Sequence, residues 1–82
     1  LRPEDRDAIA ARVAAAEPST IAGLRVASKD TLDGYRFALE GGWWLLLRFS
    51  GTEPLLRTYA EMPSAELVRD ALREGRGIAG VD

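Results

Sequence analysis

The sequence contains neither cysteine nor histidine. Without cysteine there is no disulfide, no thiolate metal site and no cysteine nucleophile. Without histidine the chain lacks the side chain that most often serves as a general base or as a metal ligand. The commonest side chains of metal centres and of nucleophilic catalysis are therefore missing from these 82 residues.

The sequence also has no excess of positive charge and no long apolar run. Eleven Lys and Arg residues stand against 13 Asp and Glu residues, which gives a net charge of −2 and argues against a nucleic-acid binder held by bulk charge. No apolar run approaches the roughly 20 residues that a membrane span needs, and no signal-peptide pattern is recognisable. We therefore expect neither nucleic acid nor a membrane as a partner.

The residues that are present are typical of one small globular domain over residues 1–82. Hydrophobic residues make up 46% of the chain and charged residues 29%, which are ordinary values for a globular protein. The sequence does not begin with methionine, and its single methionine is Met62. We expect it to be a piece of a longer protein.

Two segments are predicted to be helical, one near each end of the chain. Residues 4–16 repeat apolar side chains at i, i+4 and i+7, namely Ile9, Val13 and Ala16. The second helix is expected to begin after Ser64, a residue type that favours the N-cap position. Gly75 and Gly77 are expected to end it.

The middle of the chain is typical of β-strands separated by turns. The predicted strands are residues 21–27 (interrupted by Gly23), 35–39, 43–49 and 55–61, and the predicted turns include Ser28-Lys29-Asp30, Asp33-Gly34 and Gly41-Gly42. Strands joined by such short turns must pair antiparallel. The sequence therefore predicts a two-layer α+β domain, in which two helices cover one antiparallel sheet of about four strands.

The segment Arg48-Phe49-Ser50-Gly51-Thr52-Glu53-Pro54-Leu55-Leu56-Arg57 carries residue types that suit an anion. Gly51 allows a sharp turn, in which successive backbone N–H groups converge on a ligand. Ser50 and Thr52 add hydroxyl donors, and Arg48 and Arg57 add guanidinium forks that match a phosphate. Ser-Gly-Thr turns between strands are common, however, and arginines at strand ends are usually solvated. The residues alone leave both interpretations open.

The same segment, continued through Thr58-Tyr59-Ala60-Glu61, resembles the C-terminal-domain signature of the α-D-phosphohexomutases. That superfamily includes phosphoglucomutase, phosphomannomutase, phosphoglucosamine mutase and phosphoacetylglucosamine mutase. The signature reads Arg-x-Ser-Gly-Thr-Glu-Pro-x-x-Arg, followed by a strand that ends in Glu, and every fixed position is filled here. The resemblance implies a TBP-like α+β domain that is the fourth and last of its enzyme and closes over the substrate.

The resemblance also implies roles for particular residues. Arg48, Ser50, Gly51 and Thr52 would bind the phosphate of a phosphosugar at the end that is not reacting, and Arg57 would assist. The full-length protein would be a cytoplasmic isomerase that moves a phosphoryl group between hexose 1-phosphate and 6-phosphate. Its partners would be the phosphosugar substrate and the other domains of the same enzyme.

The family's catalytic parts find no match in this chain. Phosphohexomutases work through a phosphoserine, with magnesium held by aspartates and with a hexose bisphosphate as activator, but no Ser-His segment and no Asp-x-Asp-x-Asp run is present. We expect no catalytic residue and no magnesium ligand here, and an isolated chain that is inactive. The sequence does not specify the hexose. The alternative hypothesis is a non-catalytic α+β module that binds a protein or RNA through its sheet face.

Overall fold

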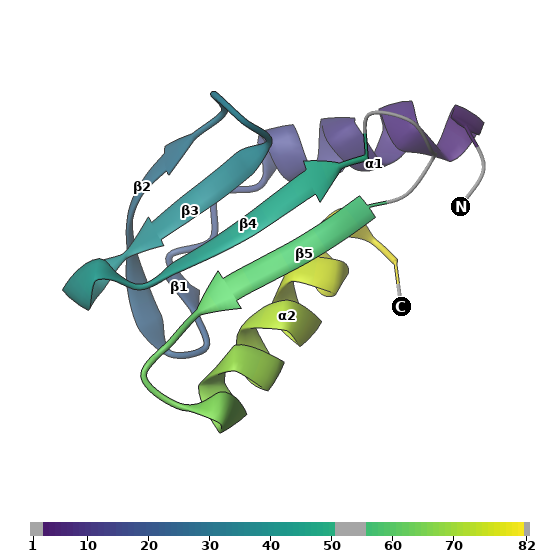
Figure 1. The fold of residues 1–82 in the computed structure, drawn as a ribbon. Coiled ribbons are helices and arrows are strands. Elements are labelled where there is room, and N and C mark those ends of the chain that lie inside the picture. Colours follow the sequence, from purple (N-terminus) through teal and green to yellow (C-terminus); the bar gives the residue numbers. More distant parts are fainter. Residues whose placement is uncertain (1–2, 51–55, 82) are drawn as a thin grey trace.

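The computed structural model describes residues 3–50 and 56–81. The elements follow in the order α1 (Pro3–Ala15), β1 (Thr20–Ile21), β2 (Leu24–Asp30), β3 (Tyr35–Leu39), the 3₁₀ turn η1 (Glu40–Gly42), β4 (Trp44–Phe49), β5 (Leu56–Glu61) and α2 (Ala65–Ala79). The expected order of helix, strands and helix is confirmed (Figure 1).

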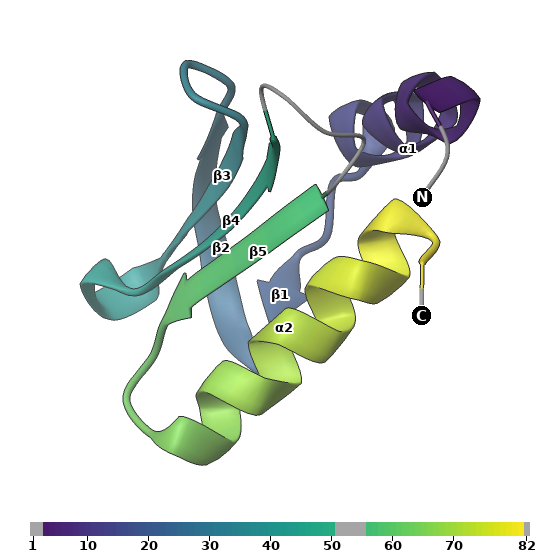
Figure 2. The same cartoon turned by 45° about the vertical axis from the view of Figure 1, so that its right-hand side comes forward.

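The strands form one antiparallel sheet in the order β1-β2-β3-β4-β5, so each strand pairs with its neighbours in sequence. The sheet has five strands rather than about four, because Thr20–Ile21 forms a short strand of its own that pairs with Leu24 and Arg25. Both helices lie on the same side of the curled sheet, as Figure 2 shows. The α+β class predicted from the sequence is confirmed.

The core lies between this face of the sheet and the two helices. Strand β4 contributes Leu45 and Leu47, which have no exposed surface, while Trp44, Leu46 and Arg48 alternate to the opposite face. The other fully enclosed large side chains are Ile9 and Val13 of α1, Ile21 of β1 and Phe37 of β3. The apolar stripe predicted for the first helix is therefore its packing face.

Strand β2 ends at Asp30, three residues beyond the predicted end, and the expectation that residues 28–30 form a turn is wrong. Lys29 pairs with Phe37 across β2 and β3, and a register irregularity lies between Val26 and Ser28. The Lys29 ammonium donates hydrogen bonds to three carbonyl oxygens at the end of α1, those of Val13 (2.8 Å), Ala14 (2.8 Å) and Ala16 (2.9 Å). Carbonyl oxygens in the last turn of a helix lack the usual i+4 partner, and here the Val13 oxygen also accepts from the N–H of Ala16 at 3.2 Å. Lys29 therefore caps α1 and joins it to the sheet.

The expectation that Gly75 and Gly77 end the second helix is also wrong. Helix α2 continues to Ala79 and ends at Gly80, which has a left-handed backbone (φ 77°). Gly75 is buried, and a Cβ atom built there would lie 3.1 Å from Leu47 Cδ2 and 3.3 Å from Leu45 Cδ2. The missing side chain therefore lets α2 pack closely on β4.

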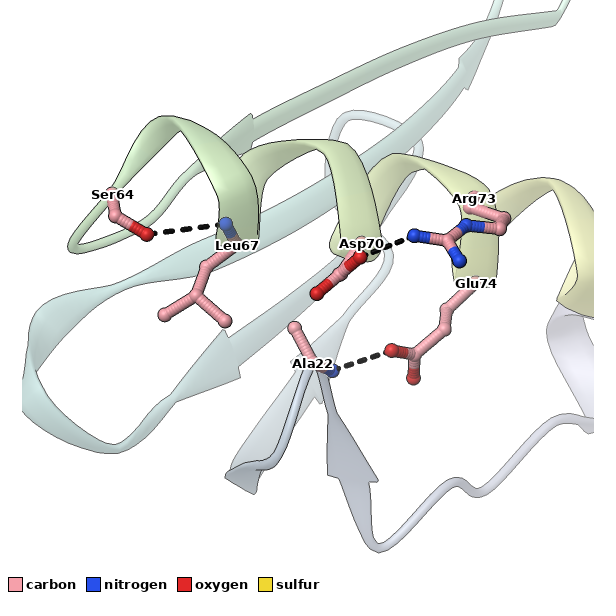
Figure 3. Close-up of polar contacts among 6 residues, drawn as sticks. All are labelled: Ala22, Ser64, Leu67, Asp70, Arg73 and Glu74. Atoms are coloured by element: carbon pink, nitrogen blue, oxygen red, sulfur yellow. Dashed lines mark hydrogen bonds and ion pairs between the residues drawn. The ribbon is translucent and has the colours of Figure 1, made fainter.

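The beginning of α2 agrees with the sequence. The Ser64 hydroxyl accepts a hydrogen bond from the Leu67 N–H at 3.2 Å, which confirms the predicted N-cap (Figure 3). Further along the helix Asp70 pairs with Arg73, and Glu74 accepts from the Ala22 N–H at 2.8 Å. The last contact ties α2 to the β1–β2 turn.

Candidate functional site

The motif identified in the sequence lies where β4 ends and β5 begins (Figure 1). Of its candidate residues, Arg48, Ser50 and Arg57 belong to the described part of the chain, whereas Gly51 and Thr52 lie outside the described residues. The described part of the site consists of the two strand ends and the residues that pack against them.

The two arginines of the motif are brought together. Arg48 and Arg57 are direct partners in the antiparallel register of β4 and β5, so their side chains leave the same face of the sheet, with Cβ atoms about 4.5–5.5 Å apart. Since Leu47 points to the helices, this is the face away from them. The sequence-based argument required these strands to be neighbours, and they are.

Two like charges placed directly opposite each other destabilise a sheet. Both arginines are exposed, and water screens part of this repulsion. Arg48 forms an ion pair with the carboxylate of Asp33, which belongs to the described part of the chain. The pair of guanidinium groups therefore gives this end of the sheet a local positive charge, although the chain as a whole carries −2.

The β2–β3 turn reaches Arg48 from the neighbouring strand. Asp33 Oδ1 lies 3.5 Å from Arg48 Nε, and both side chains are more than half exposed. The next residue, Gly34, has a positive φ of 89°, and a Cβ atom there would lie 2.7 Å from the Leu47 carbonyl oxygen and 3.1 Å from Arg48 Cβ. The sequence indicated a turn at Asp33-Gly34, but not that this turn would contact Arg48.

Ser50 and Phe49 connect the strand end to the body of the domain. Ser50 retains only 8% of its surface, and it makes polar interactions in the structure. The Phe49 ring points to the helix side, where the Arg6 guanidinium of α1 lies 5.0 Å from its centre, within the range of a cation–π contact. Helix α1 therefore packs against the end of β4 on the helix-covered face of the sheet, while Arg48 is exposed on the opposite face.

Within residues 3–50 and 56–81, no group of three or more acidic, histidine or cysteine side chains is arranged to hold a metal ion. The helices of this same part of the chain are too short or too polar to cross a bilayer.

Comparison with known proteins adds the family. Residues 9–75 match the family model described as "Phosphoglucomutase/phosphomannomutase, C-terminal domain". The chain belongs to this family. Residues 48–57, which carry the arginine pair, lie inside the matched range, so the motif and the family assignment concern the same part of this phosphoglucomutase/phosphomannomutase C-terminal domain.

The relatives of this C-terminal domain act on different sugars, according to their names. The chain is 40% identical over 74 residues to a phosphopentomutase and 41% identical over 71 residues to a phosphoglucomutase/phosphomannomutase, both of Thermococcus kodakarensis. It is 41% identical over 49 residues to a phosphoglucosamine mutase of Methanococcus aeolicus. These matches cover 90%, 87% and 60% of this chain, but only 16%, 14% and 11% of the relatives.

Proposed function

We propose that this domain binds the phosphate group of a phosphosugar within a longer mutase. The full-length protein would be an isomerase that transfers a phosphoryl group between the 1- and 6-positions of a hexose phosphate. In this proposal Arg48, Ser50, Gly51, Thr52 and Arg57 hold the phosphate that is not reacting. The domain would have no activity of its own, because it supplies binding and not the nucleophile.

The observation that carries the proposal is the register pairing of Arg48 with Arg57. Two guanidinium groups on the same face of neighbouring strands repel each other when no anion lies near them. A phosphate dianion between them would convert this repulsion into charge-assisted hydrogen bonds, and guanidinium forks match phosphate oxygens in a bidentate manner. The family assignment, which rests on residues 9–75 and includes the motif, supports the same interpretation.

Such a grip would contribute to catalysis by positioning. Phosphoryl transfer requires little covalent chemistry from side chains and depends on how well the reacting groups are aligned. A phosphate held at the non-reacting end fixes the substrate at a distance from the reacting oxygen. That phosphate is bound similarly before and during the reaction. The loss of a protein contact with it should therefore raise KM and change kcat little.

The remaining parts of the reaction belong to other parts of the enzyme in this proposal. Magnesium and a hexose bisphosphate activator would act in the full-length protein. Within residues 3–50 and 56–81, no three potential metal-ligating side chains gather. We propose that the other domains of the same enzyme are the partners of this chain and that they hold the magnesium.

The proposal is tested by removing the arginines from the full-length enzyme. Arg48→Ala should lower kcat/KM roughly ten- to a hundredfold, mainly through KM, because a hydrogen bond to a charged group contributes about 1.5–3 kcal/mol. Arg57→Ala should act in the same direction. The matched control is Arg69→Ala, which removes the same charge from an exposed position on α2.

The substrate panel should include the 1-phosphates of glucose, mannose, glucosamine and ribose, because the named relatives include both hexose and pentose enzymes. Turnover of whichever substrate is accepted is followed by phosphorus NMR. If Arg48→Ala and Arg57→Ala keep the KM of Arg69→Ala with every accepted substrate, the arginine pair does not bind phosphate and the proposal is wrong.

A further inference from the structure

The β2–β3 turn brings a carboxylate to the proposed phosphate site. Asp33 Oδ1 lies 3.5 Å from Nε of Arg48, although 15 positions separate the two residues in the sequence. A carboxylate beside an arginine that should bind an anion requires an explanation, because it competes for the same positive charge.

We propose that Asp33 is a positioning residue, which orients the Arg48 guanidinium toward the substrate phosphate. This inference rests on the proposed function. A guanidinium offers five N–H donors in a fixed plane. An oxygen placed at Nε takes the side of that plane nearest the backbone, and it leaves the two terminal nitrogens for a bidentate phosphate contact.

The position of Asp33 relative to Arg48 is set by the backbone. Tyr35 pairs with Leu47, and Gly34 approaches β4 so closely that an added Cβ atom would lie 3.1 Å from Arg48 Cβ and 3.2 Å from Arg48 Cα. The β2–β3 turn therefore packs directly against β4, the strand that carries Arg48. Asp33 extends from this fixed point, although its own side chain is 74% exposed.

Removal of Asp33 distinguishes orientation from charge, because the two effects have opposite signs. If only the local charge mattered, loss of one negative charge would make the site more positive and tighten phosphate binding. If Asp33 orients Arg48, its loss frees the guanidinium to sample other rotamers and weakens binding in spite of the more favourable charge. The direction of the change in KM therefore decides between them.

The experiment uses the full-length enzyme with its accepted phosphosugar. Asp33→Ala should raise KM about two- to fivefold, the scale of an exposed ion pair, and leave kcat unchanged. Asp33→Asn keeps an oxygen acceptor at the same place and should stay within about twofold of the wild type. The control is Asp30→Asn, which removes the same charge from the same hairpin at a residue that pairs with Arg36 (3.9 Å) and not with Arg48.

A double-mutant cycle completes the test. Asp33→Ala should add no further change once Arg48 is already alanine, because a positioning residue acts only through its partner. The inference is overturned if Asp33→Ala leaves KM unchanged or lowers it, if Asp33→Asn is as impaired as Asp33→Ala, or if the effect persists without Arg48. Should Arg48→Ala itself have a wild-type KM, the proposed function fails, whereas an impaired Arg48→Ala beside a normal Asp33→Ala refutes the role of Asp33 alone.

Discussion

Two glycines of α2 provide a measurement of how tightly this helix packs on the sheet. Gly75 and Gly77 are two positions apart in the same helix, and each can be replaced by alanine. In a helix interior, alanine is more favourable than glycine by about 0.8–1.0 kcal/mol. This gain is common to both positions, so any difference between the two variants reports their surroundings.

The surroundings differ sharply. A Cβ atom at Gly77 has nothing within 4 Å, whereas one at Gly75 would lie 3.1 Å from Leu47 Cδ2 and 3.3 Å and 3.4 Å from the two Leu45 methyl carbons. Gly77→Ala should therefore stabilise the chain by about 1 kcal/mol. Gly75→Ala should lose that gain, because an overpacked methyl group costs about 1–3 kcal/mol. We expect a net change between about zero and 2 kcal/mol of destabilisation.

Urea and thermal unfolding of the 82-residue chain measure both variants. A difference of 1 kcal/mol corresponds to a shift of about 4–8 °C in Tm for a domain of this size. The two variants should thus differ by at least several degrees, with Gly77→Ala the more stable. If Gly75→Ala raises Tm as much as Gly77→Ala does, the helix does not pack against Leu45 and Leu47 at the distances described, and the account of Gly75 is wrong.

Two further predictions concern the other close contacts of the fold. Lys29→Met should destabilise the chain by about 1.5–3 kcal/mol, because it removes the charged donor from three carbonyl oxygens at the end of α1; urea unfolding measures this, and an unchanged midpoint would show that water replaces Lys29 as the cap. Gly34→Ala should destabilise the chain more than Gly23→Ala. Both glycines have positive φ, which costs alanine about 1–2 kcal/mol, but only at Gly34 would the new Cβ atom meet a backbone oxygen, at 2.7 Å. Equal losses of Tm in the two variants would contradict the close approach of the β2–β3 turn.

Much of the fold could be predicted because the local pattern and the global structure agree. Strand β3 alternates large apolar and other side chains, and β4 is a nearly continuous apolar run. Gly41 and Gly42 both adopt the positive φ expected between the two strands, although within a 3₁₀ turn. Where the structure differs from the prediction, a long-range contact determines the local structure. Gly75 has the residue type of a helix end, but its lack of a side chain serves packing against β4, a strand that lies far away in the sequence.

In the candidate site, too, the local sequence pattern predicts some contacts, whereas others depend on long-range strand pairing. The proximity of Arg48 and Arg57 follows from a short connection between two strands, which the sequence indicates. Asp33 could not be predicted as their neighbour, because its position depends on the register of β3 against β4, and alternation fixes a register only to within two residues. A polar turn residue looks the same in a sequence whether or not it contacts a site on the adjacent strand.

Lys29 is the only lysine of the sequence, and its role as the cap of α1 has a practical consequence. A partly buried ammonium group whose donors lie on three carbonyl oxygens is less accessible to an acylating reagent than one that extends into water. The rate at which an amine-reactive ester modifies this one side chain therefore reports how often the end of α1 separates from β2. The natural sequence thus contains its own chemical probe of local opening, without any introduced label.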